Sequence, residues 1–264
     1  MGPAGESLPE GARSGGDKYV LYQPQGAPST ESVDVPPFRQ QQAFQSLPPN
    51  TSPMQYKTYL FDLDDTLVPY AARAARAQAS LIAAGVDPVR LRELDVTLWP
   101  SVAAGQLSIE AKWYRQAVES GASPAQADAF VQTMCQFELA FPEVLPLLQR
   151  LQGADRKLGI ITNGPPGAHQ RQKLAVAGLE RFFGEFVFIS SEVGAAKPDP
   201  RIFHHALQAL GSRPEEALFV GDSLPGDAGG ALGAGLAAYW LDLHQTGAAV
   251  PPGIQRITTL TQLP

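Results

Sequence analysis

The sequence predicts an α/β protein with a three-layer α/β/α parallel sheet and a helical domain inserted after its first strand. Two observations carry this prediction. From residue 142 onward, short apolar runs alternate with segments of helical periodicity, as in parallel sheets that are covered on both faces. Residues 70–141 instead carry helical patterns alone, although a strand pattern over residues 56–61 precedes them. This order of elements indicates a Rossmann-like core that is interrupted by a helical domain.

The helical domain is predicted to contain helices over residues 71–84, 87–98, 108–120 and from residue 123 onward. Gly85 ends the first helix, because glycine adopts the left-handed conformation at little cost. Asp87 before a proline is a typical N-cap for the second. Ser123 and Gln126 have the spacing of a capping box, which predicts the start of the fourth helix.

The region after residue 142 is predicted to alternate between helix and strand. Strands are predicted over residues 157–162, 186–190, 217–221, 236–241 and 254–257, and helices over residues 143–152, 167–177, 200–210 and 228–234. Parallel strands need such crossover helices to return the chain to the same sheet edge. We therefore assign residues 54–69 and 142–264 to the core domain and residues 70–141 to the inserted domain.

Residues 1–53 differ in composition from the rest of the chain. They hold nine of the 24 prolines and six glycines, with few aliphatic side chains. Such a segment buries too little apolar surface to offset the entropy of ordering it, so we expect a disordered extension. A further hypothesis is that translation starts at Met54, two residues before the first strand.

Charge and composition exclude several classes of protein. The net charge of −6 and a pI near 5.2 argue against a partner that is a nucleic-acid polymer or a membrane surface, since both require a basic face. No apolar run approaches the roughly 18–20 residues of a membrane span, and no secretory signal is visible. One cysteine, Cys135, excludes an intramolecular disulfide, and we expect it to be a small buried side chain in a helix. We expect a cytoplasmic protein; its oligomeric state is not readable from the sequence.

Two carboxylates follow the first strand, at Asp62 and Asp64. Whether the strand continues or turns after Asp62, the two side chains are held close together. Like charges at that distance are unfavourable unless a cation lies between them or one carboxyl keeps its proton. Either case indicates chemistry at this strand end.

Polar side chains also follow the other strands of the predicted sheet. Thr162 and Asn163 follow the second strand, Lys197 comes after the third, and Asp222 and Asp227 follow the fourth. Ligands bind at the carboxyl ends of strands in open parallel sheets, so we expect these groups to converge. Together they supply oxygen ligands for Mg²⁺, a nucleophile and donors for an anionic group.

Four segments, DLDDTL, ITNG, AAKPDPRIF and VGDSLPGDAGGALGAG, resemble the ordered motifs of the haloacid dehalogenase (HAD) superfamily. The resemblance covers residues 56–264, and within the superfamily it is to the phosphatases that carry a helical cap after the first motif. The DLDDTL and ITNG segments resemble those of nucleotidase-like members. It implies a Mg²⁺-dependent phosphatase that acts through a phosphoaspartate on a small phosphorylated metabolite. A nucleoside monophosphate, a sugar phosphate and flavin mononucleotide are the candidate substrates.

The resemblance also implies a role for each matching position. Asp62 is the implied nucleophile, and Asp64 the implied acid and base. The carboxylates of Asp62 and Asp222 and the backbone carbonyl of Asp64 are the implied Mg²⁺ ligands, with Asp227 orienting water in the second shell.

The phosphoryl oxygens are expected to contact Thr162, the backbone of Asn163 and Lys197. Thr66 is expected to fix the loop rather than to touch substrate. In this family the cap covers the site and sets substrate choice. Arg73, Arg76 and Trp113 are therefore specificity candidates, although an arginine pair on a solvated helix face and a tryptophan in the cap core are the simpler interpretations.

Four alternatives remain open at this stage. A 2-haloacid dehalogenase uses the same nucleophile on carbon, but it needs neither Mg²⁺ nor a carboxylate at the position of Asp64. A phosphonate hydrolase needs a cap lysine, for which Lys112 is the one candidate in residues 68–141. A phosphomutase differs in the acceptor of the phosphoryl group. A non-enzymatic binding module predicts a damaged motif, whereas all four motifs are intact.

Overall fold

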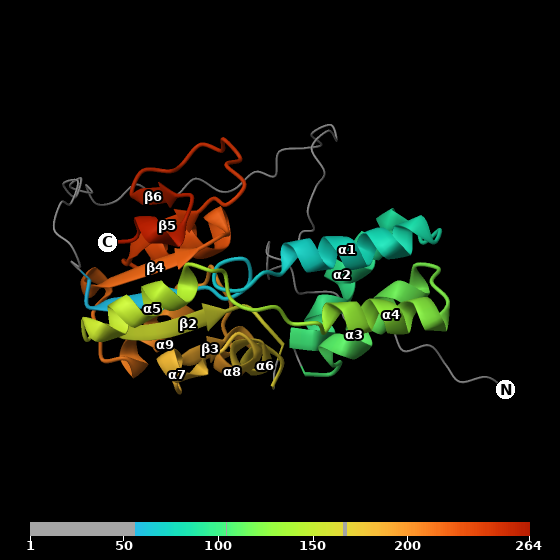
Figure 1. The fold of residues 1–264 in the computed structure, drawn as a ribbon, viewed down its shortest axis with the longest axis horizontal. Helices are drawn as coiled ribbons and strands as arrows, with labels where there is room; N and C mark the ends of the chain where they lie inside the picture. Colours follow the sequence, from blue (N-terminus) through green and yellow to red (C-terminus); the bar gives the residue numbers. More distant parts are fainter. Residues whose placement is uncertain (1–55, 104, 166–167) are drawn as a thin grey trace.

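A computed structural model describes residues 56–103, 105–165 and 168–264. The predicted extension over residues 1–53, and with it the hypothesis of a start at Met54, lies outside the described residues. Six parallel strands form one sheet in the order β3-β2-β1-β4-β5-β6 (Figure 1). Their bounds are β1 (Thr58–Phe61), β2 (Lys157–Thr162), β3 (Val187–Ile189), β4 (Ala217–Gly221), β5 (Ala237–Leu241) and β6 (Ile254–Ile257). The predicted α/β class with a parallel sheet is confirmed.

The strand that carries the first two carboxylates is central in the sheet. Phe61, the last residue of β1, pairs in register with Ile160 of β2 and Val220 of β4. The chain moves outward from β1 to β3 and then returns to β4 on the other side of β1. Crevices form where strand order reverses in this way, so the switch between β1 and β4 is the expected place for a ligand.

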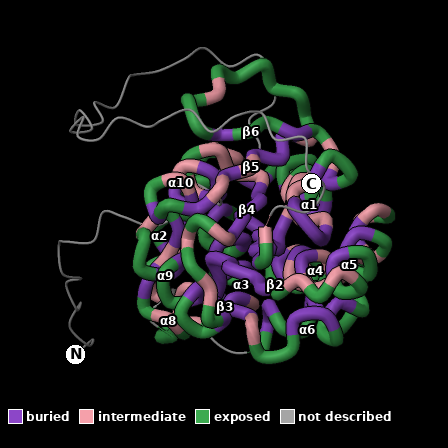
Figure 2. Tube along the Cα trace, turned by 90° about the vertical axis from the view of Figure 1, so that its left-hand side faces the viewer, coloured by how far each residue is buried: buried purple, intermediate pink, exposed green. Residues whose placement is uncertain are grey.

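Helices cover both faces of the sheet. The core helices are α5 (Val144–Gly153), α6 (His169–Val176), α7 (Glu180–Phe183), α8 (Ser190–Val193), α9 (Pro200–Ala209) and α10 (Gly230–Gly233). They are joined by the 3₁₀ turns η2 (Pro214–Glu216) and η4 (Leu260–Gln262) and by the π-helix η3 (Leu224–Gly229). Tyr59 and Phe61 pack with α5, α6 and α7, whereas Leu60 packs with α9 and α10 on the opposite face. This alternation follows from the two-residue period of a strand. Figure 2 shows the resulting buried interior.

The inserted helices form a separate unit beside the sheet (Figure 1). They are α1 (Ala71–Ala83), α2 (Pro88–Ala103), α3 (Ile109–Glu119) and α4 (Pro124–Met134). Leu81, Leu91 and Phe130 belong to a hydrophobic cluster of this unit alone, so it has its own core. None of the described residues between 70 and 141 lies in a strand. Among the described residues, every helix is too short or too polar to cross a bilayer.

Asp65 joins the inserted unit to the end of β1. Its carboxylate accepts hydrogen bonds from the backbone N–H groups of Tyr70 and Ala71 at 2.9 Å. It thus satisfies backbone donors at the start of α1. Asp65 has a φ of 57°, a conformation that aspartate tolerates better than most residues. Burial raises the pKa of this carboxyl, and the bond from Ala71 opposes that effect.

Several elements differ from the prediction. α2 continues to Ala103 through Pro100, because the buried Leu98 and Val102 anchor the helix on both sides of the proline. Residues 224–229 form a π-helix before α10, where a single helix over residues 228–234 is expected. The short helices α7 and α8 were not predicted. Cys135 ends α4 and is half-buried rather than inside the helix.

Candidate active site

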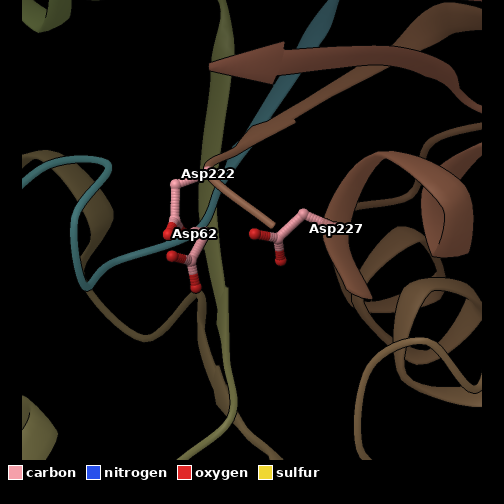
Figure 3. Close-up of side chains that lie close together, drawn as sticks. All are labelled: Asp62, Asp222 and Asp227. Carbon is pink, nitrogen blue, oxygen red and sulfur yellow. The ribbon is translucent and has the colours of Figure 1, made fainter. Parts of the chain in front are cut away.

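Three carboxylates converge at the switch between β1 and β4. Asp62 follows β1, Asp222 follows β4, and Asp227 lies in η3. One ligand oxygen of each lies within 4.8 Å of the others, and Figure 3 shows the three side chains turned toward one another. Asp62 and Asp227 are fully buried. Such a group of buried charges is stable only with positive charge beside it.

Lys197 supplies part of that positive charge. Its Nζ lies 2.6 Å from Asp62 Oδ1 and 2.6 Å from Asp227 Oδ1, and its side chain is 1% exposed. The hydroxyl of Thr66 donates to Asp62 Oδ2 at 3.3 Å, in agreement with a role in fixing the loop. One ammonium thus bridges two of the three carboxylates. The structure brings together Lys197 and the aspartates that the sequence places on separate strand ends.

The end of β4 is shaped so that Asp227 can turn back toward Asp62. A Cβ on Gly221 would lie 2.3 Å from Asp227 Oδ2, so no other residue fits there without displacing this carboxylate. Asp227 Oδ2 accepts the backbone N–H of Ser223 at 2.9 Å. The indole of Trp240 donates to the backbone oxygen of Asp222 at 2.8 Å, which fixes the backbone of the third carboxylate.

Asp64 lies outside this cluster and has a cation of its own. Lys173 Nζ is 2.8 Å from Asp64 Oδ1 and 2.9 Å from Oδ2. Gln170 donates to Asp64 Oδ2 at 3.2 Å and to the hydroxyl of Thr162 at 2.7 Å. Lys173 and Gln170 are both buried on α6. Two helical residues thus orient the second carboxylate and connect it to the end of β2.

Asn163 uses its side chain to position the segment of Lys197. Its amide nitrogen donates to the backbone oxygen of Lys197 at 3.0 Å, and its amide oxygen accepts the Lys197 N–H at 2.9 Å. The next residue, Gly164, donates its N–H to Ser190 Oγ at 3.1 Å. Thr162 and Asn163 therefore lie beside the carboxylates, with the Asn163 side chain occupied and its backbone at the sheet edge.

The donor set fits a magnesium ion. Mg²⁺ prefers oxygen ligands, usually one or two carboxylates with water and substrate oxygens completing the shell. Asp62, Asp222 and Asp227 offer carboxylate oxygens at one point, whereas no histidine or cysteine belongs to a comparable group within the described part of the chain. The residues present are thus those that a hard divalent cation needs.

Lys173, Gln170 and His169 were not singled out from the sequence. All three lie in α6, which follows the ITNG segment, and all three are buried. Their position in the sequence could have indicated these three residues, because the first turns of a helix that follows a motif strand lie near the carboxyl edge of the sheet. This helix is strongly polar, so its sequence does not indicate which of its faces is buried.

At the junction with the inserted unit, Tyr70 links the two halves of the site. Lys173 Nζ lies 5.2 Å from the centre of the Tyr70 ring, and the Arg73 guanidinium carbon lies 5.6 Å from the same centre. Burial and then the charge of Asp95 raise the pKa of Tyr70 well above 10. This phenol therefore remains neutral, and its ring is close both to Lys173, the partner of Asp64, and to Arg73 of the inserted unit.

His169 meets the aromatic side chains of the inserted unit. Its ring contacts Trp113 at 5.4 Å and Phe137 at 5.1 Å between centroids, both edge to face. Burial and then the charge of Lys173 lower the pKa of His169 to about 4, so the imidazole is neutral at pH 7. Trp113 is buried in the core of the inserted unit and contacts this histidine from there.

The two arginines that are candidates for substrate specificity differ in their surroundings. The side chain of Arg76 is 64% exposed and pairs with Glu138 at 2.9 Å on the surface. Arg73 is 2% exposed and donates from Nη1 to the backbone oxygen of Gln136 at 3.1 Å. Residues three apart on a helix lie about 60° apart in direction, which is enough to separate a solvated side chain from a buried one.

Lys112, the lysine on which the phosphonate alternative depends, is buried within the inserted unit. It forms an ion pair with Asp95, another buried residue. Burial lowers the pKa of Lys112, and the charge of Asp95 opposes that effect. Lys112 is thus held by a carboxylate inside the helical unit.

Comparison with known families places this geometry in context. The family model described as haloacid dehalogenase-like hydrolase matches residues 56–235. That range holds the strands β1 to β4, the inserted helices and every residue of the carboxylate cluster.

Three similar proteins are named as phosphatases or as a nucleotidase. A phosphoserine phosphatase of Thermus thermophilus is 39% identical over 158 residues, which are 55% of this chain and 62% of that protein. A glyceraldehyde 3-phosphate phosphatase of Methanopyrus kandleri is 34% identical over 195 residues, 68% of this chain and 81% of that protein. The pyrimidine 5′-nucleotidase YjjG of Escherichia coli is 38% identical over 138 residues, 52% of this chain and 59% of that protein. Two of these three matches thus span less than two thirds of the relative.

Solved structures with the same fold include a hydrolase bound to magnesium and a 2-haloacid dehalogenase. The HAD-hydrolase YfnB of Bacillus subtilis, crystallised with magnesium, aligns with a TM-score of 0.59 at 24% identity over 78% of this chain and 96% of that chain. A 2-haloacid dehalogenase of Pseudomonas syringae aligns with a TM-score of 0.55 at 28% identity over 78% and 96%. The fold therefore does not by itself separate phosphatase from dehalogenase.

Proposed function

Since this chain belongs to the haloacid dehalogenase-like hydrolases, we propose that it is a Mg²⁺-dependent phosphatase of small phosphomonoesters. The observation that carries the proposal is the arrangement around Asp62. This buried carboxylate contacts Lys197 and clusters with Asp222 and Asp227. Asp64, the second carboxylate of the motif, follows two residues later with its own cation. These contacts support the proposal of a nucleophile, a cation site and a separate proton carrier in one place.

In the first half-reaction, a carboxylate oxygen of Asp62 attacks phosphorus. The bond between phosphorus and the leaving oxygen breaks, its electron pair stays on that oxygen, and Asp64 donates a proton to it. The products are an alcohol and a phosphoaspartate at Asp62. Lys173 and Gln170 hold the Asp64 carboxylate in place for this transfer.

In the second half-reaction, water attacks the phosphoaspartate. Asp64, now a carboxylate, takes a proton from the water as its oxygen bonds to phosphorus. The bond between phosphorus and the Asp62 oxygen breaks, which releases inorganic phosphate and restores both aspartates. Lys197, Thr162 and the backbone of Asn163 are proposed to hold the phosphoryl oxygens.

Asp62, Asp222 and the backbone carbonyl of Asp64 are the proposed ligands of Mg²⁺, with Asp227 in support. The ion supplies charge neutralisation, which lets an anionic carboxylate approach an anionic phosphate. Asp227 contacts Lys197 and accepts the Ser223 N–H, and these two contacts fix the orientation of its carboxylate within the cluster.

A small metabolite is the proposed substrate, because Tyr70 of the inserted unit lies beside Lys173, the partner of Asp64, where a bulky substrate would have to displace it. We propose that residues 70–141 act as a cap over the strand ends, with Tyr70 and His169 at the boundary between cap and core. The relatives named above as acting on phosphoserine, glyceraldehyde 3-phosphate and pyrimidine nucleotides support a substrate of this size.

The test is phosphate release from a broad panel of phosphorylated metabolites, with p-nitrophenyl phosphate as a general probe. Wild-type protein with Mg²⁺ is expected to release phosphate, and an acid-stable phosphoenzyme is expected on rapid quenching. Asp62→Asn should lose both while its circular dichroism spectrum stays the same. A mutant that still turns over would remove Asp62 as the nucleophile.

A 2-haloacid dehalogenase is the second candidate, favoured by the solved dehalogenase that shares the fold. The cluster of Asp62, Asp222 and Asp227 argues against it, since attack on carbon needs no cation site. Halide release from a 2-haloacid without added metal would support this candidate instead.

A further inference from the structure

Arg73 is a buried cation, and only part of its hydrogen-bonding capacity is satisfied within the protein. Nη1 donates to the backbone oxygen of Gln136, but Nε and Nη2 are shielded from solvent and have no hydrogen-bond partner. No carboxylate of the described residues forms an ion pair with this guanidinium. A charged donor that is left unpaired away from water destabilises the folded protein, so its presence here calls for a functional explanation.

The neighbouring cations are neutralised, whereas Arg73 is not. Lys173 pairs with Asp64. Lys112 pairs with Asp95. The remaining surroundings of Arg73 are aromatic, with the Tyr70 ring centre at 5.6 Å and the Phe137 ring centre at 5.7 Å from its guanidinium carbon. Aromatic faces stabilise a cation less than an anionic partner does in a buried site.

The position of Arg73 relative to the catalytic groups suits a substrate contact. Lys173, which holds Asp64, lies over the same Tyr70 ring as Arg73 does. Asp64 is the group that donates to the leaving oxygen, so the alcohol part of the substrate lies on this side of the site. Arg73 and the cation that holds Asp64 thus share one aromatic neighbour, Tyr70, which places the guanidinium near the proposed alcohol part of the substrate.

We infer that Arg73 is a specificity residue that binds a second anionic group, a carboxylate or another phosphate, on the alcohol part of the substrate. This inference rests on the proposed function. The planar guanidinium presents Nε and Nη2 side by side, the edge that binds such groups with two parallel hydrogen bonds. Both atoms are shielded, so the ligand enters while the helices α1 to α4 are displaced from α6 and is enclosed when they return.

Binding to an inactive enzyme tests the inference without turnover. Calorimetry on Asp62→Asn would compare two pairs of compounds, 3-phosphoglycerate with glycerol 3-phosphate, and fructose 1,6-bisphosphate with fructose 6-phosphate. In at least one pair, the member with the second anionic group should bind roughly tenfold tighter or more. The first pair reports a carboxylate ligand and the second a phosphate ligand.

Adding Arg73→Met should abolish the preference within that pair, and Arg73→Lys should restore part of it. The matched control is Arg115→Met, an exposed arginine on α3 whose partner is Glu119; it should keep the preference. Equal binding within both pairs, or a preference that survives Arg73→Met, would overturn the inference. Absence of phosphate release by wild-type protein would overturn the proposed function while the binding result stands.

Thermal unfolding without ligand provides a second readout. A residue kept for ligand binding should cost stability, so Arg73→Met should raise Tm by a few degrees because it removes an unpaired buried charge. A purely structural arginine predicts the reverse. A fall in Tm of several degrees in Arg73→Met would therefore assign Arg73 to the fold and contradict the inference.

Discussion

Lys173 Nζ lies 2.8 Å from Asp64 Oδ1 and 2.9 Å from Asp64 Oδ2, so one ammonium contacts both oxygens of the proposed proton carrier. Both residues are buried, and Gln170 adds a third bond to the same carboxylate. The proposed proton carrier is thus oriented by a core helix, independently of the Lys197 contact that orients Asp62, the proposed nucleophile.

Lys173→Met should slow turnover by displacing Asp64. We expect kcat for alkyl phosphates to fall by roughly 10–100-fold, because a misplaced acid no longer protonates a poor leaving group. p-Nitrophenyl phosphate has a good leaving group and should lose less. Steady-state kinetics on both substrates gives this difference, which a merely structural role for Lys173 does not produce.

Arg171→Met is the control for this experiment, since Arg171 is an exposed cation on the same helix and pairs with Glu192. It should leave both substrates unaffected. Lys173→Met should also lower the free energy of unfolding by roughly 3–5 kcal/mol, because it leaves Asp64 buried without its cation. Equal losses of kcat on both substrates would contradict the positioning role.

Mg²⁺ should stabilise the folded protein as well as support activity. Asp62, Asp222 and Asp227 repel one another, so a divalent ion bound among them favours the native state. At about 100 times its Kd, the ion contributes roughly 2.7 kcal/mol, a rise in Tm of about 5–10 °C. Thermal unfolding with Mg²⁺ and with EDTA measures this shift, and EDTA should also stop phosphate release until Mg²⁺ is restored.

Asp222→Asn should reduce the Mg²⁺-dependent rise in Tm, whereas Asp128→Asn, at an exposed position on α4, should leave it as it is. A shift of equal size in both variants would remove the aspartate cluster as the metal site. Turnover in EDTA would favour the dehalogenase candidate.

His169 should remain neutral in the folded protein far below its ordinary range. Burial, and then Lys173, lower its pKa to about 4, whereas histidine in an unfolded chain titrates near 6.5. Between these two values the unfolded chain binds a proton that the folded chain does not, so stability falls as pH falls from 6.5 to 4. The loss is at most about 3–4 kcal/mol.

Urea unfolding at a series of pH values measures this slope, and NMR titration of the imidazole gives the pKa directly. His169→Gln should remove this part of the slope, and His244→Gln, at an exposed position, should keep it. An NMR pKa near 6.5 for His169 would contradict the buried, neutral state.

The sheet was largely predictable because its signals are local. The strands over residues 157–162, 217–221 and 254–257 have the predicted bounds, since short apolar runs between turn residues define them. Asp62 and Asp222 were expected at one edge because parallel strands share a direction. The register of β1 with β2 and β4 places their carboxyl ends together.

The buried polar residues were not predictable in this way. α6 is strongly polar, so its sequence does not indicate that Gln170 and Lys173 are covered by the inserted unit and by Asp64. Likewise, the spacing of Arg73 and Arg76 does not reveal which one faces the interior. Both assignments depend on how the helical unit packs on the sheet, which is a tertiary property.

Gly221→Ala should disturb the carboxylate cluster from the backbone side. A Cβ at this position would lie 2.3 Å from Asp227 Oδ2, the atom that accepts the Ser223 N–H. Asp227 must then turn away from Lys197, which breaks a buried ion pair and moves one of the three carboxylates. We expect a loss of roughly 1–3 kcal/mol in the free energy of unfolding, together with weaker Mg²⁺ binding.

Gly233→Ala is the matched control, because a Cβ on Gly233 meets nothing within 4 Å and the residue is helical. It should leave Mg²⁺ binding unchanged and stabilise the protein slightly, since alanine loses less backbone entropy on folding. Urea unfolding and calorimetric titration with Mg²⁺ separate the two effects. If Gly221→Ala binds Mg²⁺ as wild type does, the orientation of Asp227 is not what shapes the metal site, and support for the ion rests on Asp62 and Asp222 alone.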